Sequence, residues 1–467
     1  MTVIQSVEGN NNNKAKKMIR VLVAGSSYGG LSVVKRFLKL AENINFKNNK
    51  IKITLVDPKP GFINVMAIPQ TMIDLKSAKN SYTNIENYNL KFDSVRLLKN
   101  NSNSTIKTSI ECDKQIGLLR EDIGNNNSIK LEFIQGYIKD FSPNKNQAII
   151  SKDIVKKFNL HTGLAPPASS SDENNIPIEE EIIDYDYCVL ATGRSRSWPY
   201  DPIGETQKNF IKEMETCKSK IENSNIISII GGGALGIELA GELKQTYPEK
   251  QIQLIHPHAL LPPESLISDN FKEKVIYYLT EKLGVKLFLN TRIFKEDSNS
   301  SLITTNNETI KSDLNLWCNK HLNYVSYLKP DYIVNKDEVN VNNHLQLKDS
   351  NTGEIMENVY ACGDLTSFPI IKKAGYAYRQ GEVAATNIFR QITAQLQLDN
   401  DGHEVGQQPL EVFKYDESPV NSMVMMLSTH YAVSCHSLDH IDENDPAVLG
   451  YYHDYRTENI KYCLGLE

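Results

Sequence analysis

Runs of aliphatic residues alternate along this chain with segments whose apolar positions recur at helical spacing. Ile19–Ala24 is a short β-branched and aliphatic run, typical of a strand buried on both faces. Apolar residues then recur every three or four positions across Leu31–Leu38, which predicts a helix. A second apolar run, Ile51–Val56, predicts another strand. The pattern is that of a strand, a helix and a parallel strand.

The same order returns in the middle of the chain. Ile226–Ile230 and Gln251–Ile255 are predicted strands, and Ile237–Leu243 between them has helical spacing. An amphipathic helix is predicted over Phe271–Leu283, followed by a strand at Val285–Leu289. Two such units in one chain indicate an α/β protein with parallel sheets.

Further buried strands end in small or acidic residues. The apolar run Tyr185–Gly193 closes on Ala-Thr-Gly, and Asn358–Asp364 closes on Gly-Asp. A helix is predicted from Lys372 to Ile392. In the tail we expect one apolar strand, Met423–Leu427, followed by mixed polar sequence.

Length and composition indicate a multidomain globular protein. The 467 residues suggest two or three domains, and 40% hydrophobic with 23% charged residues is ordinary for a soluble protein. Residues 1–17 are polar and asparagine-rich, and we expect them to be disordered. We interpret residues 163–181 as a surface loop between two hairpin strands and residues 398–409 as a polar linker.

Charge and cysteine content narrow the class further. A net charge of −6 argues against recruitment by nucleic acid. No apolar run approaches the ~20 residues of a spanning helix, and the N-terminus resembles no targeting signal, so we expect a cytoplasmic location. The seven cysteines are isolated, which favours a reduced intracellular protein without a redox-active pair.

The first candidate site follows the first strand. Gly25–Gly30 is a glycine-rich turn at the start of a helix, and Asp57 stands at the tip of the next strand. Such glycines let a backbone approach a pyrophosphate, the helix N-terminus supplies N–H groups, and the acid binds ribose hydroxyls. The turn departs from G-x-G-x-x-G at Ser27, whose small hydroxyl can itself donate to a phosphate.

The second candidate site has the complete motif. Gly231, Gly233 and Gly236 form G-x-G-x-x-G directly after a strand. The tip of the following strand is Leu254–His258, which contains no acid. An acid there would repel the 2′-phosphate of NADPH, so we expect NADPH to be accepted at least as well as NADH. As metal ligands His256 and His258 would need further partners, and no metal site is expected.

The ordered set of motifs resembles the pyridine nucleotide–disulfide oxidoreductase superfamily, and within it the apoptosis-inducing-factor-like group that includes the ferroptosis suppressor protein. The resemblance spans roughly residues 18 to 430 and lies in Asp57-x-Lys59-x-x-Phe62, Gly231–Glu238, Val359–Asp364 and Lys372-x-Ala374-x-x-Ala377-x-x-Gln380. It implies two Rossmann-like domains, for FAD and NAD(P)H, with the second inserted in the first, and a small C-terminal α+β region. The implied boundaries are 18–204 and 336–397 for the FAD domain, 205–335 for the NAD(P)H domain and 398–467 for the C-terminal region.

The resemblance also implies a role for each matching residue. For FAD it implies Gly25, Ser27, Gly29 and Gly30 at the pyrophosphate, Asp57 and Lys59 at the adenosine ribose, Thr192 and Gly193 along the flavin nucleotide, Gly363 and Asp364 at the ribityl chain or pyrophosphate, and Lys372 and Ala374 at the isoalloxazine. For NAD(P)H it implies Gly231, Gly233, Gly236 and His256 near the nucleotide and Glu238 at the nicotinamide. Lys372 and Glu238 are the candidate catalytic residues, although a surface lysine and a solvated helix acid are the plainer interpretations. The sequence Leu316–Asn319 replaces a second Ala-Thr-Gly that the superfamily often has.

The function implied is that of an FAD-dependent NAD(P)H oxidoreductase acting on a quinone or a similar small acceptor. Gly61–Lys76, where one branch of the superfamily carries its redox-active cysteines, contains none. Two alternatives stay open, a nucleotide-responsive binding protein and a reductase of a small protein electron carrier. Peripheral membrane contact also stays open, and no sequence feature fixes the oligomeric state.

Overall fold

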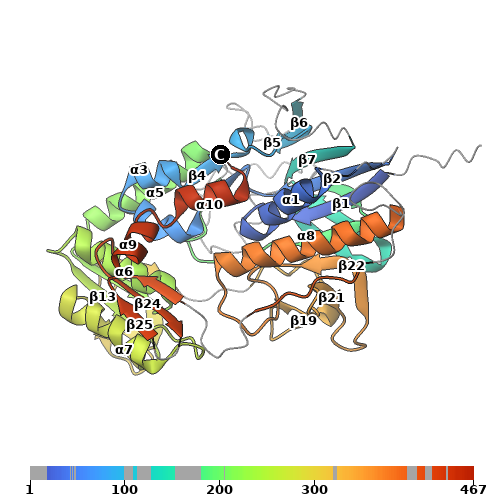
Figure 1. Cartoon of the computed structure of the whole chain (residues 1–467). Coiled ribbons are helices and arrows are strands. Elements are labelled where there is room, and N and C mark those ends of the chain that lie inside the picture. The colour runs from blue at the N-terminus through green and yellow to red at the C-terminus, as the bar shows by residue number, and fades with distance from the viewer. Residues whose placement is uncertain are drawn as a thin grey trace, which may run out of the picture.

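The computed structural model describes residues 18–42, 44, 46, 49–98, 109–112, 128–152, 180–204, 206–318, 323–396, 408–415, 423–437 and 440–466. The predicted disordered N-terminus 1–17 and most of the predicted segments 163–181 and 398–409 lie outside these residues. The described residues form two lobes with a C-terminal region that contacts both (Figure 1).

The larger sheet draws its strands from two distant parts of the chain. In spatial order it contains β21 (Gln346–Lys348), β22 (Ile355–Ala361), β11 (Tyr187–Leu190), β1 (Met18–Ala24), β2 (Lys50–Asp57), β7 (Ile129–Gln135), β5 (Ser94–Leu98) and β6 (Ser109–Cys112). The six inner strands are parallel, and the two edge strands run antiparallel to their neighbours.

Both faces of this sheet are covered, which explains why its central strands are continuously apolar. Val21 and Val23 of β1 belong to the core shared with α1 (Tyr28–Ala41) and α8 (Ala374–Leu396), which lie side by side in Figure 1. Leu22 and Ala24 belong to the core on the other face. That face is covered by the antiparallel sheet of β8 (Tyr137–Ser142), β9 (Gln147–Ser151) and β10 (Glu180–Asp184).

The second sheet lies between these two parts of the chain in sequence. Its four strands, β14 (Lys286–Phe288), β13 (Gln251–Ile255), β12 (Ile226–Ile230) and β18 (Leu314–Trp317), are all parallel. The helices α5 (Gln207–Glu222), α6 (Ala234–Thr246) and α7 (Asp269–Tyr277) pack around it. A small sheet of β15 (Ile293–Glu296), β16 (Leu302–Thr304) and β17 (Thr309–Ile310) lies beside it. This arrangement confirms the predicted α/β fold, in which the second Rossmann-like unit is inserted in the first.

Shorter elements lie between these strands and helices. The segment between β2 and β5 contains β3 (Gly61–Ile63), η1 (Val65–Ala67), α2 (Ile68–Thr71), α3 (Leu75–Asn80), β4 (Tyr82–Asn84) and η2 (Ile85–Asn87). η3 (Pro143–Lys145) lies between β8 and β9, and the connection from the second unit back to the first contains η5 (Pro330–Tyr332), β19 (Ile333–Val334) and β20 (Glu338–Val339). The helix predicted over 271–283 begins two residues earlier, as α7, and continues as the π-helix η4 (Tyr278–Lys282). It ends at Gly284, whose φ is 76°.

The C-terminal region is more regular than the pattern of apolar residues predicts. The expected strand is β23 (Met423–Met426), which pairs with β24 (Ala432–Ser437), and β24 pairs in turn with β25 (His440–Glu443). The helices α9 (Pro446–Tyr452) and α10 (Thr457–Leu464) follow. Met425 and Val433 pack in the core of the second unit, whereas Leu464 and Leu466 pack in the core of the first. The region therefore bridges the two units.

Candidate functional site

A cavity of about 1010 Å³ lies between the two units and the C-terminal region. The first glycine turn, the tip of β2, the Thr192–Arg196 segment and the start of α8 form one part of its wall. Glu238 of α6 and residues of β23, β24, α9 and α10 form the rest. Most of the site residues expected from the sequence line this cavity. They are Gly25, Ser27, Gly29, Asp57, Lys59, Thr192, Gly193, Glu238, Gly363, Asp364, Lys372 and Ala374.

The first glycine turn needs glycine for steric reasons. Gly25 has φ of 110°, and a Cβ there would lie 2.2 Å from the carbonyl oxygen of Ala191. A Cβ on Gly30 would lie 1.8 Å from the carbonyl oxygen of Gly25. Ser27 is the N-cap of α1, and its side chain makes no capping hydrogen bond. The turn thus brings the start of α1 to the cavity wall, where N–H groups can face an anion.

Asp57, the acid predicted to bind the adenosine ribose, is hydrogen-bonded to this turn. Asp57 ends β2, and its carboxylate accepts hydrogen bonds from the backbone N–H of Ser26 at 2.7 Å and of Lys59 at 2.8 Å. These bonds fix the carboxylate in the cavity wall beside the turn. The ammonium of Lys59, expected near the same ribose, donates to Asp201 at 2.7 Å.

Asp201 holds together three segments that are far apart in sequence. Lys59 follows β2, Asp201 lies in the connection that leads to the second unit, and Tyr324 lies in the connection that returns from it. The Tyr324 hydroxyl donates to Asp201 at 2.6 Å, and the Tyr324 N–H donates to the carbonyl of Gly193 at 3.0 Å. Thr192 donates to the Tyr324 carbonyl at 2.7 Å. The Ala-Thr-Gly segment therefore also aligns the two connections.

The Gly363–Asp364 turn is positioned from α8. The Gly363 N–H donates to the side-chain oxygen of Gln380 at 2.6 Å, and Gln380 is 1% exposed. Asp364 lines the cavity, and its carboxylate lies 3.5 Å from the guanidinium of Arg196. Gln380 belongs to the sequence motif, but the sequence alone does not reveal that it anchors this turn.

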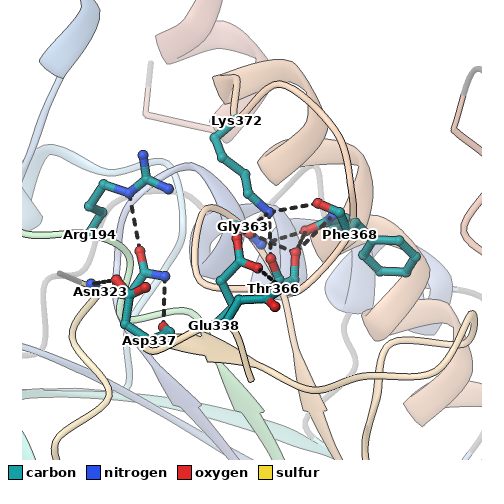
Figure 2. A network of polar contacts seen from close by, with 10 residues as sticks. Arg194, Asn323, Asp337, Glu338, Gly363, Thr366, Phe368 and Lys372 are labelled. Atoms are coloured by element: carbon teal, nitrogen blue, oxygen red, sulfur yellow. Dashed lines mark hydrogen bonds and ion pairs between the residues drawn. The ribbon is translucent and has the colours of Figure 1, made fainter. Parts of the chain in front are cut away.

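Lys372 lies in the segment just before α8, and its ammonium turns toward the Gly363–Thr366 turn (Figure 2). It donates to the carbonyl oxygens of Thr366 and Phe368 and lies 3.7 Å from the carboxylate of Glu338. Figure 2 also shows Arg194 donating to Asn323, whose amide is in turn held by Asp337. These contacts hold a positive charge in the cavity wall at the predicted isoalloxazine position.

The second glycine turn has a similar backbone; its glycines do not line the cavity, but Ala234 and Leu235, which follow directly, do. Gly231 has φ of 120°, and a Cβ on Gly236 would lie 1.9 Å from the Gly231 carbonyl oxygen. Gly233 is the N-cap of α6, and a Cβ there would meet no atom within 4 Å. This open N-terminus of α6 suits a second pyrophosphate.

His256 occupies the strand tip beside the second turn. Its Nδ1 accepts a hydrogen bond from the Gly232 N–H at 3.0 Å, so the ring proton lies on Nε2. Nε2 is buried and has no hydrogen-bond partner among the described residues. Burial, helped by His258 and Arg292, lowers the pKa of His256 to about 4, so the ring is neutral at physiological pH.

Glu238 is a partly buried acid in the cavity wall rather than a solvated one. Burial, followed by repulsion from Glu242, raises its pKa to about 8, and a backbone hydrogen bond from Met426 opposes that rise. Burial also raises the pKa of Glu242 to about 6, and its hydrogen bond with Tyr455 opposes the rise. This observation disfavours the plain interpretation of Glu238 as a surface charge.

Three cysteines line the cavity, which their isolation in the sequence did not predict. Cys362 is fully buried against Gly29, and burial raises its pKa to about 12. Cys435 is 2% exposed with a raised pKa, and Cys463 contacts Asn459 at 3.7 Å. All six cysteines whose side chains the structure describes are free thiols. Within the described part of the chain, no three His, Cys, Asp or Glu side chains are grouped to hold a metal ion.

The sequence predicted one side of the cavity well and the other poorly. The residues that it missed are Arg196, Asp201, Tyr324 and the C-terminal Tyr455 and Arg456, all of which line the cavity. Gly30 supports the turn from behind, and Gly231, Gly233, Gly236 and His256 gather at the second turn. Arg196 could have been suspected from the ordered sequence Thr-Gly-Arg-Ser-Arg, whereas the others carry no local motif.

Comparison with known proteins agrees with this geometry. The family described as pyridine nucleotide-disulphide oxidoreductase matches residues 19–381, which include both glycine turns and the Gly363–Asp364 turn. The chain belongs to this family. As a member, it is an oxidoreductase of the class that uses FAD and NAD(P)H.

Two similar family members belong to the predicted group. Apoptosis-inducing factor 1 of Saccharomyces cerevisiae is 31% identical over 279 residues, which are 54% of this chain and 70% of that protein. Human ferroptosis suppressor protein 1 is 26% identical over 281 residues, 57% of this chain and 69% of that protein. The sulfide:quinone oxidoreductase of Aquifex aeolicus shares the fold, with a TM-score of 0.59 at 13% identity over 96% of this chain and 91% of that one.

The residues of this family member fit the cofactors that the family uses. Gly193 has φ of 70°, and a Cβ there would meet no atom within 4 Å, so the Ala-Thr-Gly backbone is open to the cavity. The Ala-Thr-Gly segment would hold FAD together with the first glycine turn, Asp57 and Asp364. The open N-terminus of α6 would hold the NAD(P)H pyrophosphate, and Glu238 lies where the two sites meet.

Proposed function

We propose that this protein is an FAD-dependent NAD(P)H oxidoreductase that passes electrons to a quinone or a similar small acceptor without a redox-active disulfide. One observation supports this proposal most: a single cavity is lined by the first glycine turn, by Glu238 and by the apolar side chains of Ile371 and Met426. A concave site with apolar walls and a few polar groups suits a flat organic molecule beside a flavin.

In this proposal the protein positions its cofactors and shapes their electrostatic surroundings. The chemistry that FAD would supply when bound is the acceptance of a hydride from NAD(P)H and the transfer of electrons to the acceptor. Asp57 would bind the adenosine ribose of FAD, and Asp364 would bind the ribityl chain or the pyrophosphate. Lys372 would hold a positive charge near the isoalloxazine, which favours reduced flavin. Glu238 orients the nicotinamide. The other residues keep the binding roles that the family resemblance implies. These residues are Ser27, Lys59, Thr192, Ala374, His256 and the glycines of the two turns, of the Ala-Thr-Gly segment and of the Gly363–Asp364 turn.

Two further features belong to the same proposal. A neutral His256 at the strand tip presents no charge that would repel a 2′-phosphate, and the exposed His258 and Arg292 lie on nearby segments. NADPH is therefore accepted at least as well as NADH. Among the helices that the structure describes, none is both long and apolar enough to cross a bilayer. A cytoplasmic location and the domain boundaries at 204, 335 and 397 stay predictions.

The experiment is a panel of acceptors offered to the purified flavoprotein with NADPH and with NADH. We expect sustained turnover with a water-soluble quinone and much less with a ferredoxin- or rubredoxin-like protein. Turnover with the protein carrier alone would select the electron-carrier reductase instead. Slow turnover with every acceptor, accompanied by a long-lived reduced flavin–NAD complex, would select the nucleotide-responsive binding protein.

A further inference from the structure

The face of α6 that meets the cavity carries two carboxyl groups one helical turn apart. Glu238 lines the cavity, and Glu242 is only 2% exposed. Side chains four residues apart on a helix lie on the same face, so the two carboxyl groups are neighbours. A carboxyl group is rarely buried this deeply without a partner, so Glu242 calls for an explanation.

The C-terminal region explains how Glu242 is buried. A Cβ on Gly241 would lie 1.5 Å from the carbonyl oxygen of Leu427, so the end of β23 rests directly on the backbone of α6. The Tyr455 hydroxyl donates a hydrogen bond to Glu242 Oε1 at 2.9 Å. Tyr455 is itself 3% exposed and lines the cavity. Glu242 is thus sealed from solvent and bound by one phenol.

Tyr455 is held in place from the flavin side of the cavity. Its backbone has φ of 51°, in the left-handed region, and its carbonyl accepts a hydrogen bond from Asn64 at 3.2 Å. Asn64 is fully buried, and its side-chain oxygen accepts a hydrogen bond from the Tyr28 hydroxyl at 2.7 Å. Tyr28 follows Ser27 in the first glycine turn. A buried polar chain therefore connects the predicted flavin-binding turn with Glu242.

The charges around the pair favour one neutral and one ionised carboxyl group. Two adjacent carboxylates in a site of low polarity cannot both be ionised without a large penalty. Burial and Glu242 raise the pKa of Glu238 to about 8, whereas the Tyr455 hydroxyl donates to Glu242 and favours its anion. The Met426 N–H is the other group that acts on Glu238.

Among the residues that the structure describes, no positive charge contributes to the pKa shifts of the pair. Glu264, Lys373 and Arg456 line the same cavity, yet none of them shifts the pKa of Glu238 or Glu242. Two further elements pack on α6. The helix α2 has no ionisable side chain, and the Tyr278 hydroxyl of η4 accepts a hydrogen bond from Asn444. Burial also keeps the Tyr455 phenol protonated, because its pKa is raised well above the usual value.

We propose that Glu242 and Tyr455 are positioning residues that keep Glu238 a neutral carboxylic acid, which donates a hydrogen bond to a carbonyl oxygen of the molecule bound in the cavity. An ionised carboxylate could only accept there, and it would repel a carbonyl oxygen. The carbonyl belongs either to the carboxamide of the nicotinamide nucleotide or to a quinone acceptor. This inference rests on the proposed function.

The direct test is infrared spectroscopy of the flavoprotein, which follows the carbonyl stretch of protonated carboxyl groups as the pH rises. We expect one such band to disappear near pH 8 in the native protein and to be missing in Glu238→Gln. In Glu242→Gln the like charge is gone, so the band disappears about one pH unit lower or more. Tyr455→Phe moves it in the same direction by a smaller amount, because Glu242 then holds its own proton more readily.

A matched control is Glu215→Gln, which removes an exposed carboxyl group from α5 of the same unit and leaves the titration in place. A native protein without a carboxyl band that titrates near pH 8, or a band that Glu242→Gln does not move, would overturn the inference. Because Glu242→Gln keeps the shape of the side chain and an oxygen for Tyr455, a folding defect is not expected. The titration of the native protein decides the question without any variant.

Rapid mixing then identifies the carbonyl. Flavin bleaching by NADPH and reoxidation by a soluble quinone are measured separately across the same pH range. A rate that falls near pH 8 in the bleaching step, and falls at lower pH in Glu242→Gln, assigns the bond to the nicotinamide carboxamide. The same behaviour in the reoxidation step assigns it to the acceptor. If neither step follows the infrared titration, Glu238 is not a donor. Bleaching by NADPH near neutral pH tests the proposed function independently of these outcomes.

Discussion

The two glycine turns have the same backbone but different chemistry. In both, the first glycine has a positive φ, 110° at Gly25 and 120° at Gly231. In both, a Cβ on the last glycine would lie within 2 Å of the carbonyl oxygen of the first, 1.8 Å for Gly30 and 1.9 Å for Gly236. These positions are set by the close packing of a strand against the helix that follows it, which leaves no room for a side chain.

The two turns differ at the tip of the next strand. In the first turn the carboxylate of Asp57 accepts the N–H of Ser26 at 2.7 Å, and in the second the neutral ring of His256 accepts the N–H of Gly232 at 3.0 Å. In both turns the side chain at the strand tip accepts a hydrogen bond from the residue after the first glycine. This side chain is an anion in the first turn and an uncharged group in the second. In the function proposed above, the backbone of each turn binds a dinucleotide, and the strand tip selects the ribose that the turn accepts.

The largest expected effect comes from filling the last glycine of each turn. Gly30→Ala places a methyl group against the Gly25 carbonyl, so we expect loss of bound FAD and of much of the folded protein. Gly236→Ala makes the same clash in the second turn, so we expect FAD to be kept while kcat/KM for NADPH falls by about a hundredfold, ~2.7 kcal/mol. Flavin absorbance and steady-state kinetics measure the two effects.

Gly450→Ala in α9 is the control, because a Cβ there would meet no atom within 4 Å. It should leave both readings unchanged and stabilise the helix slightly, by ~0.5–1 kcal/mol. The comparison of the turns would fail if Gly236→Ala lost its flavin while Gly30→Ala kept it.

The next effect concerns the two strand tips. Asp57→Ala leaves the N–H groups of Ser26 and Lys59 without their acceptor and removes the ribose ligand. Because hydrogen bonds to charged groups contribute ~1.5–3 kcal/mol, we expect FAD affinity to fall at least about tenfold. His256→Ala should keep its FAD, since His256 belongs to the other turn. Flavin release during dialysis compares the two, and equal release from both variants would contradict the assignment.

A smaller change makes the second tip resemble the first. His256→Asp introduces an anion, which repels the 2′-phosphate of NADPH. We expect the ratio of kcat/KM for NADPH to that for NADH to fall about tenfold, ~1.4 kcal/mol. In the native protein, a preference for NADH above about a hundredfold would show that the neutral tip does not permit NADPH.

The smallest effect is expected from the thiols. The cysteines at the cavity are free, and burial raises the pKa values of Cys362 and Cys435, so the reactive thiolate is disfavoured. With all seven cysteines replaced by Ser or Ala, quinone reduction should stay within about tenfold, ~1.4 kcal/mol on the barrier. A single replacement that abolishes activity while flavin content and stability are intact would instead place a thiol in the mechanism.

The sequence predicts the turns because their requirements are local. Each key position lies at the end of an apolar strand, so the pattern of apolar residues locates it directly. Gly25 follows β1, Gly231 follows β12, and Asp57 is the last residue of β2. The confirmed α/β fold follows from the same patterns. The role of Gln380 as an anchor for Gly363 needs a contact between β22 and α8, which no local pattern encodes.

The other half of the cavity depends on contacts between distant segments. Lys59 meets Asp201, 142 residues further along the chain, and Tyr455 meets Glu242 from a distance of 213 residues. The tail looks mixed and polar because its strands and helices bury only part of their surface against two separate cores. Neither feature leaves a periodic signal in one sequence.

The most direct test of the central claim is an anaerobic titration of the purified protein with NADPH, followed by its visible spectrum. We predict stoichiometric FAD, bleaching of the flavin by NADPH in the native protein and in Gly450→Ala, and return of the flavin colour when a quinone is added. In Gly236→Ala the same flavin should be present but bleach only at much higher NADPH. A colourless protein that is folded, or a flavin that NADPH does not bleach, would contradict the assignment of the two turns to FAD and NAD(P)H.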